Sequence, residues 1–356
     1  MKNKRKIAFL LSFVLVMALA FTGCGKSGDS SEGQTNADSD VEQIYEFSIA
    51  HIQNDGDAGD EALVYLAEIL EERSEGRIDA TVYGNKSLAS SDTELGELVR
   101  QNSVQCVPVP THTISAMANI PEYKVFEFPY LFNSWDDIYK LLDSDMANEW
   151  AKVLEDEAGV YIYDGFVKGW LSIGTKKGPM SAPDDFKGLK IRTMSTDMQM
   201  ALINSLGAGA TVVSYGELYT AAQQGTVDGM LTATSLYKTD RFCEVIDHLS
   251  IIRATAHFHI PVVNKQWVDS LPDDLRIIFD ECMVDYVAKA RELEEAADAA
   301  VIESLETDEG LNVRVYTDEE IKPFREATKT VWDDNYNVPG EGVMDAVLKF
   351  LGEERP

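Results

Sequence analysis

The feature that most constrains the fold is a regular succession of short strand-like runs and longer helix-like segments that starts at residue 45. Residues 45–51 (YEFSIAH) alternate between apolar and polar side chains, and residues 60–74 follow with helical spacing. Residues 77–83 alternate again, residues 92–102 are helical, and residues 104–109 form a short apolar run. This β-α-β-α-β order predicts a mostly parallel sheet.

A second set of such elements starts near Gly165 and indicates a second α/β region. The globular part of the chain, about 310 residues, is larger than one core usually organises, which also favours two domains. The expected strands are residues 170–174, 189–192, 211–213, 228–231 and 256–264, and the expected helices are residues 196–206 and 215–224.

Residues 272–305 form a charged amphipathic pattern that contains no glycine and no internal proline. One or two long helices are expected there, because nothing inside the segment ends a helix. Such a length is unusual inside one compact lobe, so we expect an element that braces two domains.

The N-terminus carries the pattern of an export signal. Basic residues gather within residues 1–6, residues 7–21 are apolar and uncharged, and a Thr-Gly-Cys sequence ends at Cys24. This apolar run is short for a membrane span, which takes roughly 20 residues. We predict a lipoprotein signal over residues 1–24 with Cys24 acylated, and a flexible polar tether over residues 25–43. An uncleaved anchor helix or an ordinary signal is the alternative.

The chain is strongly acidic, with 61 Asp and Glu against 31 Lys and Arg and a formal net charge of −30. Nucleic acid is not expected as a partner, because the sequence has no clustered basic stripe. An anionic ligand would have to be held by local positive charge.

Three cysteines remain after Cys24, namely Cys106, Cys243 and Cys282, at long and irregular spacings. No disulfide framework follows from this pattern. We expect three small buried thiols, and one disulfide pair is the alternative.

Several blocks occur in an order that resembles one transporter family. Residues 183–195 read PDDFKGLKIRTMS, and residues 204–229 read NSLGAGATVVSYGELYTAAQQGTVDG. Further matches are FPYLF at residues 128–132, EERSEGRIDATVYGNKSL at residues 71–88 and VVNKQWVDSLPDDL at residues 262–275. Over nearly the whole mature chain, the sequence resembles the solute-binding proteins of TRAP (tripartite ATP-independent periplasmic) transporters.

The resemblance implies an α/β, two-lobe periplasmic-binding-protein-like fold with a hinge and a long bridging helix. We assign residues 44–168 plus 260–300 to lobe I and residues 169–259 plus 301–356 to lobe II. The resemblance also implies capture of a small organic acid and its delivery to TRAP permease subunits. The lipid anchor would hold the protein at the outer face of the cytoplasmic membrane. Because such systems run on ion gradients, neither a nucleotide nor another cofactor is expected.

Arg192 is the first candidate for ligand binding. It ends the predicted strand GLKIR, and open α/β sheets place ligands where strands end. Its guanidinium can pair with a carboxylate through two parallel hydrogen bonds. From the residues alone, a structural ion pair is the alternative. The resemblance favours the ligand role, because the family's carboxylate-binding arginine falls at this place in the motif.

The other candidates follow from the same resemblance. Tyr215 stands where an aromatic ring often closes over the ligand, although a core position at a helix start is the alternative. Thr232 stands where relatives often carry an asparagine, and offers a hydroxyl instead. Leu171 replaces a second arginine and lies beside Trp170, which favours a monocarboxylate over a dicarboxylate. Ser195 and Thr111 are further candidates from the resemblance. Tyr237 is a candidate for which a surface or hinge-packing role is the alternative, and Asp55 is a weaker candidate in the loop after the first strand, where an ordinary turn is the alternative.

Other classes of function have less support. The sequence contains no G-x-S-x-G, no H-E-x-x-H and no Gly-rich phosphate loop, so no enzyme is expected. His257 and His259 would share one face of a strand, and we interpret them as packed histidines rather than a metal site. A lipoprotein sensor or adhesin without a transport role is the alternative; an exposed apolar patch in place of a closed cleft would distinguish it.

Overall fold

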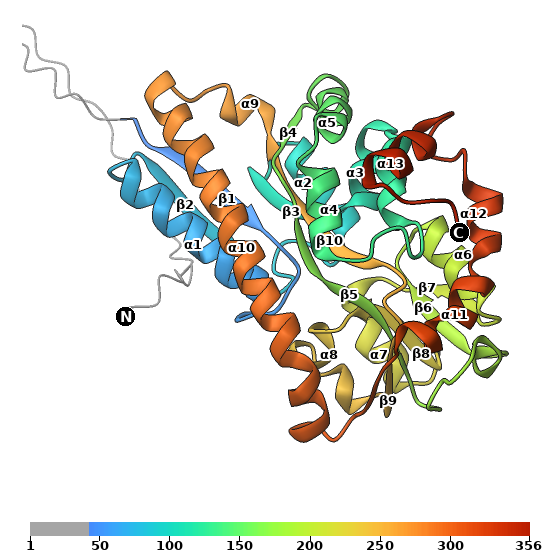
Figure 1. Ribbon diagram of the computed structural model, residues 1–356. Coiled ribbons are helices and arrows are strands. Elements are labelled where there is room, and N and C mark those ends of the chain that lie inside the picture. The colour runs from blue at the N-terminus through green and yellow to red at the C-terminus, as the bar shows by residue number, and fades with distance from the viewer. Residues whose placement is uncertain (1–42) are drawn as a thin grey trace, which may run out of the picture. The chain divides into compact units, whose positions relative to one another are not determined.

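The computed structural model describes residues 43–356 as an α/β protein built on an eleven-stranded sheet (Figure 1). Its strands are β1 (Tyr45–Ala50), β2 (Ile78–Tyr83), β3 (Cys106–Pro110), β4 (Val160–Ile162), β5 (Phe166–Thr175), β6 (Lys190–Thr193), β7 (Gly209–Val212), β8 (Gly229–Ala233), β9 (His248–Ile251), β10 (Ala256–Asn264) and β11 (Asn312–Val315). The strand order is β2-β1-β3-β10-β5-β8-β6-β7, with β4, β9 and β11 beside this path. We call β1–β4 with β10 the first half-sheet, and β6–β9 with β11 the second; β5 pairs with both.

The first half-sheet follows the predicted β-α-β-α-β order. β1 pairs in parallel with β2 and β3, and the connections are α1 (Ala58–Arg73) and α2 (Asp92–Arg100). Helix α1 begins where the Asp57 side chain accepts a hydrogen bond from Gly59 N, and α2 begins where Ser91 accepts one from Glu94 N. These caps satisfy backbone donors that a first turn leaves open.

Two long strands run against the others and join the half-sheets. β10 pairs antiparallel with β3, β4 and β5, and β5 pairs antiparallel with β8 and β9. The β5–β10 register shifts between His257 and Phe258, which leaves Lys168 as an extra residue beside Gly169 at φ +130°. The predicted parallel pairing is therefore confirmed for β2-β1-β3 and for β8-β6-β7, but not for the crossing strands.

Short helices and 3-10 turns connect the strands β6 to β9 of the second half-sheet. The predicted helix at residues 196–206 is α6, and the one at residues 215–224 is a 3-10 turn followed by α7. The bounds here are η2 (Pro183–Phe186), α6 (Asp197–Ser205), η3 (Tyr215–Glu217), α7 (Leu218–Gln223), α8 (Leu236–Thr239) and η4 (Phe242–Glu244).

The remaining helices were not predicted from the sequence. The C-terminal helix packs on α4 and η1, so the end of the chain returns to residues 121–142. Met344 and Val347 share a buried cluster with Phe128 and Leu131. The bounds are α3 (Thr111–Ala118), η1 (Pro121–Glu127), α4 (Trp135–Leu142), α5 (Asp145–Glu157), α9 (Lys265–Val268), α11 (Asp318–Ala327), α12 (Lys329–Asn335) and α13 (Val343–Leu351).

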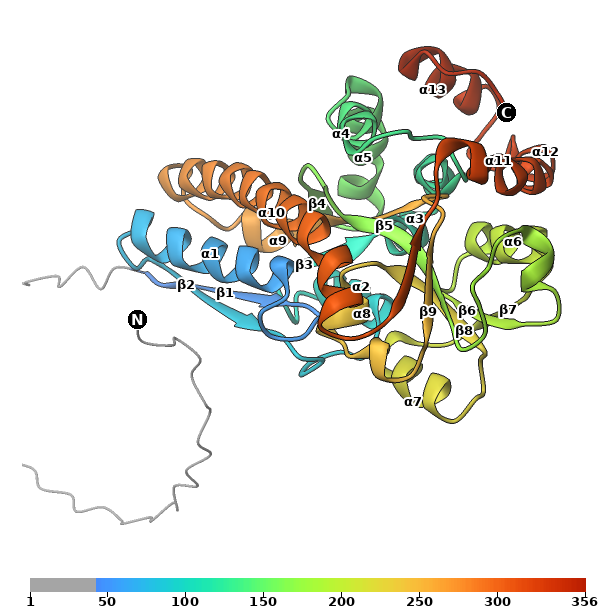
Figure 2. The ribbon, with the colours of Figure 1, turned by 60° about the horizontal axis from the view of Figure 1, so that its bottom comes forward.

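The bracing element is a single helix, α10 (Asp273–Thr307), which runs beside α1 (Figures 1 and 2). Phe279 in its first half packs in one buried cluster with residues of α1 and β1. Val301 and Leu305, near its end, belong to a second cluster with residues of β8 and β9. The helix therefore contributes to the cores of both halves, as the sequence predicted. The residue limits of the two lobes stay a prediction.

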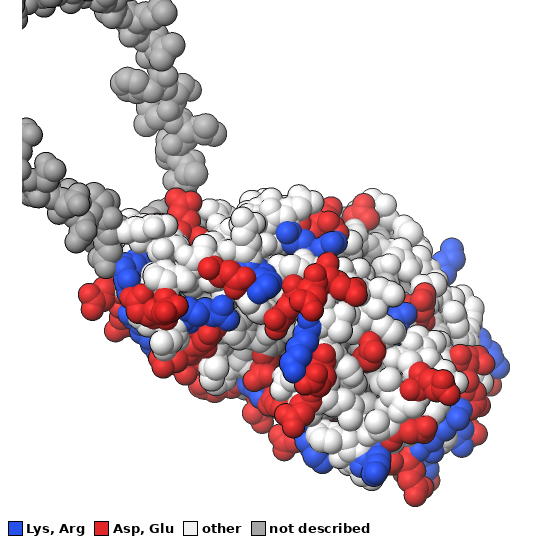
Figure 3. Space-filling model, turned by 90° about the horizontal axis from the view of Figure 1, so that it is seen from above, with Lys and Arg blue, Asp and Glu red and all other residues white. Residues whose placement is uncertain are grey.

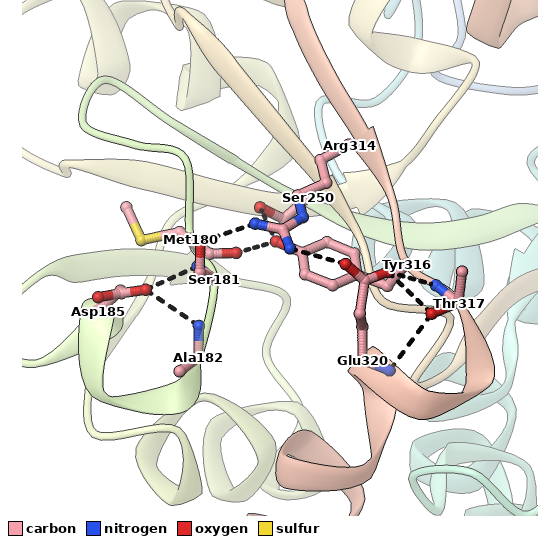
Figure 4. Close-up of polar contacts among 9 residues, drawn as sticks. All are labelled: Met180, Ser181, Ala182, Asp185, Ser250, Arg314, Tyr316, Thr317 and Glu320. Carbon is pink, nitrogen blue, oxygen red and sulfur yellow. Dashed lines mark hydrogen bonds and ion pairs between the residues drawn. The ribbon is translucent and has the colours of Figure 1, made fainter.

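A polar cluster fastens the chain after α10 to the second half-sheet (Figure 4). The Tyr316 hydroxyl donates to the Met180 carbonyl and lies 3.2 Å from Ser250 Oγ. Arg314 Nη1 donates to Ser181 Oγ at 2.7 Å. With β11 paired to β9, these bonds fix the route from α10 to α11.

The described residues bear on three further predictions. Within residues 43–356, no helix is both long and apolar enough to cross a bilayer. Cys24, the predicted export signal and all of the tether but its last residue lie outside the described residues. Cys106, Cys243 and Cys282 are free thiols, but Cys243 is only half-buried, so the prediction of three buried thiols is wrong there. Figure 3 shows a face on which acidic side chains gather in groups and basic ones are interspersed among them.

Candidate ligand-binding site

Arg192 lies buried in β6 of the second half-sheet, with 3% of its surface exposed. Its neighbour Ile191 packs into the core of that half, so the guanidinium extends from the opposite face of the strand. Arg192 Nε donates to the Val213 carbonyl at 2.9 Å, and Nη1 donates to the Leu231 carbonyl at 3.3 Å. In residues 43–356 no carboxylate lies within ion-pair distance of it, so these bonds orient the charge without neutralising it.

The electrostatic surroundings of Arg192 keep it charged. Burial lowers its pKa to about 10, against the opposing effects of Tyr215, Asp92 and Tyr237. The group therefore remains a cation at neutral pH. A desolvated cation without a paired anion is an unfavourable arrangement, which an incoming carboxylate would improve.

Tyr215 begins η3 and is covered from the other half of the molecule. Lys86, in the loop after β2, places its Nζ 5.1 Å from the Tyr215 ring centroid and 3.6 Å from Asp240 Oδ1. Burial, and then Asp240, raise the pKa of the Tyr215 hydroxyl. A Cβ at Gly216 would lie only 3.3 Å from the Ser90 carbonyl. The β2–α2 loop is thus in direct contact with the second half-sheet's loops.

A second contact of this kind comes from the loop after β1. Asn54 Nδ2 donates to the Thr239 carbonyl at 3.2 Å. The predicted residue Asp55 follows, and its backbone N donates to Asn85 Oδ1 at 3.1 Å, which ties the β1 and β2 loops together. The two halves therefore touch along this edge.

Two residues that the sequence did not single out belong to the surroundings of Arg192. Asp92 is the first residue of α2; burial raises its pKa to about 7, although Arg192 acts to lower it. Asp92 Oδ1 is buried and has no hydrogen-bond partner among the described residues. Burial, and then Arg192, lower the pKa of His112 to about 4. Burial, followed by Lys168, His112 and Arg192, lowers the pKa of His257 to about 3, so both imidazoles are neutral at pH 7.

A small pocket lies where α3, β10 and the start of α6 meet. The predicted residue Thr111 and Glu127 are among its lining residues, and Glu127 Oε2 accepts a hydrogen bond from Thr196 Oγ1. Burial raises the pKa of Glu127 to about 7. The polar lining residues are Thr111, His112, Glu127, Gln199 and His257.

The other predicted residues are placed as follows. Thr232 is buried in β8, opposite Ser172 of β5. Trp170 is half-buried against the cluster around β10, whereas Leu171 points to the opposite face, into the core of the second half. Adjacent strand residues cannot line the same wall. Ser195 is exposed between β6 and α6.

The Tyr237 hydroxyl is fully engaged within the core. It accepts from Gly174 N at 2.8 Å and lies 3.0 Å from the Ser172 carbonyl and 2.8 Å from the Met230 carbonyl. No polar group of this side chain is left to offer a ligand, so its influence on Arg192 is electrostatic.

His257 and His259 lie with their ring centroids 4.8 Å apart, both buried in β10. In residues 43–356 no group of three His, Cys, Asp or Glu residues is arranged to hold a metal ion. The interpretation of His257 and His259 as packed histidines stays a prediction.

The positions of Asp92 and His112 suggest a signal that the sequence analysis did not use. Both stand at the first turn of a helix in the first half, and His112 directly follows β3 with Thr111. The carboxyl ends of parallel strands lie at one edge of a sheet, so polar residues at these connections gather there. Applied to the connections after β2 and β3, this rule would have placed Asp92 and His112 near Asp55, which follows β1.

Comparisons with known proteins agree with this architecture. The family described as bacterial extracellular solute-binding protein, family 7, matches residues 49–338. The C4-dicarboxylate-binding periplasmic protein DctP of Rhodobacter capsulatus is 27% identical over 288 residues, which cover 80% of this chain and 85% of that protein.

Solved structures share the fold. The sugar acid binding protein DctPAm of Advenella mimigardefordensis, in complex with galactonate, superposes with a TM-score of 0.82 at 23% identity, covering 87% of this chain and 98% of that one. A TRAP periplasmic solute-binding protein of Sulfurospirillum deleyianum with bound succinate gives a TM-score of 0.79 at 22% identity, covering 86% and 98%.

Proposed function

Because the chain belongs to the bacterial extracellular solute-binding proteins of family 7, we propose that it captures a small monocarboxylate between its two lobes and delivers it to a TRAP membrane permease. The family is a solute-binding component of transport. Its relatives bind organic acids, among them C4-dicarboxylates in Rhodobacter capsulatus.

The observation that carries the proposal is the state of Arg192. Its guanidinium is buried, held in place by two backbone carbonyls, and without an ion pair among the described residues of a chain with net charge −30. A ligand carboxylate would neutralise this guanidinium and form a charge-assisted hydrogen bond with it.

A single carboxylate suits the charges around this group. Lys168 is already neutralised by Asp57 at 2.5 Å and Glu294 at 2.9 Å. His112 and His257 are held neutral by burial. A second carboxylate would find no free cation among these groups, so a dicarboxylate should bind less well than a monoacid of similar size.

Closure of the lobes accompanies capture in this proposal. The contacts of Lys86 with Asp240 and of Asn54 with the Thr239 carbonyl form only when the two halves approach. A ligand held by Arg192 favours that state, because it makes more contacts there than in an open one.

The test is a thermal-shift and calorimetric screen of purified protein with lactate, pyruvate, gluconate, phenylacetate and succinate. At least one monocarboxylate should stabilise the wild type, and Arg192→Ala should lose that stabilisation. Arg192→Lys keeps the charge but not the fork and should bind weakly. Lys152→Ala, at an exposed ion pair on α5, is the charge control. Succinate binding more tightly than every monoacid would contradict the monocarboxylate proposal.

The proposal also includes acylation of Cys24, which would hold the protein at the outer face of the membrane. Expression with a labelled fatty acid should label the wild type but not Cys24→Ser. Release of the unlabelled variant into the soluble fraction would support the anchor, and equal labelling of both would contradict it.

A further inference from the structure

Asp92 differs from the other acidic residues of α2 in its surroundings. Glu94, two positions on, accepts hydrogen bonds from Ser90 N and Oγ at 2.6 and 3.0 Å. Asp92 Oδ1, in contrast, is buried and has no hydrogen-bond partner in the described part of the chain. A buried carboxyl oxygen without a partner is costly unless something outside the fold pairs with it.

The groups that face Asp92 come from several elements. Helix α2 packs on β3, α3 and β10. Their titratable side chains are Cys106, His112, His257 and His259, all of which burial keeps neutral at pH 7.

From the second half, the charge of Arg192 acts on Asp92 without an ion pair between them, and Tyr215 lies next to the Gly216–Ser90 contact beside α2. Lys86, in the preceding loop, is held by Asp240. Arg192 is therefore the one cation that acts on Asp92 among these groups.

From this arrangement, and resting on the proposed function, we propose that Asp92 contacts the ligand in its protonated form. Its hydroxyl would donate to the carboxylate that Arg192 holds, so that the capture of each anion takes up one proton.

The physical reason is competition for one guanidinium. Two carboxylates close to Arg192 repel each other, and in a buried site such a pair shares a proton. Burial raises the pKa of Asp92 to about 7, so part of this carboxyl is already protonated at neutral pH. The ligand carboxylate raises this pKa further and leaves Asp92 as a donor. The unpartnered oxygen then gains a partner only when ligand is bound.

The experiment measures affinity against pH by calorimetry, with the monocarboxylate of the screen that binds most tightly. If only the protonated form of Asp92 binds, the affinity should fall about 30-fold between pH 6 and pH 8.5. At pH 7.5 the binding enthalpy should differ between phosphate and Tris buffers by an amount that corresponds to proton uptake.

Asp92→Asn keeps a donor of similar shape without the titration. It should bind at pH 8.5 about as tightly as the wild type does at pH 6, with no proton uptake. A gain in affinity at high pH cannot come from misfolding. Glu94→Gln is the matched control and should keep the wild-type profile.

Three outcomes would overturn the inference. The first is a wild-type affinity that does not change with pH, and the second is an Asp92→Asn variant whose affinity depends on pH as that of the wild type does. The third is a loss of this pH dependence in Glu127→Gln instead, which would assign the proton to Glu127 in the neighbouring pocket. If no acid binds the wild type at any pH, the proposed function fails as well. If acids bind without proton uptake, only the role of Asp92 fails.

Discussion

Two buried cations, Lys168 in β5 and Arg192 in β6, differ in the partners that the fold gives them. Lys168 is 1% exposed and contacts Asp57 and Glu294, whose side chains are equally buried. Arg192 is 3% exposed and, within the residues that the structure describes, donates only to backbone carbonyls. Burial lowers the pKa of both groups. At Lys168 the two carboxylates outweigh it and raise the pKa, whereas at Arg192 nothing does.

The difference is between a cation that the fold neutralises and one that we propose as the partner of the ligand. The Lys168 contacts join the bulge in β5 to the start of α1 through Asp57 and to the middle of α10 through Glu294. They hold three elements together where the chain crosses between halves. Arg192 has backbone bonds that orient it and no counter-ion among residues 43–356, and we propose that a ligand carboxylate supplies one.

Removal of Lys168 is the most direct test of the difference between the two cations. Lys168→Met leaves Asp57 and Glu294 buried without a cation, and the free energy of unfolding should fall by about 3–5 kcal/mol. Urea unfolding of the ligand-free protein measures it. Lys152→Met, which removes an exposed lysine, should leave the unfolding midpoint unchanged. Equal unfolding midpoints for Lys168→Met and Lys152→Met would show that the buried contacts of Lys168 do not stabilise the fold.

The next largest effect concerns Arg192 and should appear in binding instead of stability. Arg192→Met should weaken binding of the best monocarboxylate by about 2–5 kcal/mol, because it removes the charged partner of the ligand. Its unfolding free energy should fall far less than that of Lys168→Met, since no buried carboxylate loses a pair. A large loss of stability in Arg192→Met would mean that Arg192 stabilises the fold, as Lys168 does.

The sequence predicted the elements around these two sites better than the sites themselves. Periodicity located β1, α1, β2, α2 and α10, because one face of each is apolar at a fixed spacing. Helices α3 to α5 were missed, and so was the return of the C-terminal helices to the first half, where long-range packing decides the position.

Side-chain partners were harder to predict than elements. Lys168 finds its carboxylates 111 and 126 residues away in the chain, and no local pattern indicates such pairs. Asp92 resembles an ordinary acidic residue in the first turn of a helix. Arg192 was singled out because it ends a predicted strand and because its motif resembles a known family. Its lack of a counter-ion in the described part of the chain became apparent only from the fold.

His257 offers a third, smaller test, because both cations act on it. Burial, then Lys168 and, less strongly, Arg192 lower its pKa from 6.5 to about 3. The folded protein keeps the ring neutral while the unfolded chain protonates it, so this contribution to stability is lost as pH falls below 6.5.

Between pH 6.5 and pH 5 the loss should be about 2 kcal/mol for the wild type. His257→Gln removes the titration and should flatten the slope by that amount in urea unfolding across this range. Parallel slopes for the two proteins would mean that the ring is not held neutral by its surroundings.

The smallest expected effect tests whether contacts between the halves help to retain the ligand. Lys86 lies 3.6 Å from Asp240, with about a quarter of its side chain exposed, so solvent weakens the pair. Lys86→Met should leave Arg192 and its orientation intact, yet weaken ligand binding by about 0.5–1 kcal/mol through faster dissociation.

Stopped-flow measurement of ligand dissociation at low and high salt separates the loss of the Lys86 contact from a change at Arg192. Added salt should raise the dissociation rate of the wild type towards that of the variant, because screening weakens the same contact between Lys86 and Asp240. It should not slow dissociation from either protein. A variant that dissociates at the wild-type rate in low salt would mean that the closed state is held by the ligand and Arg192 alone.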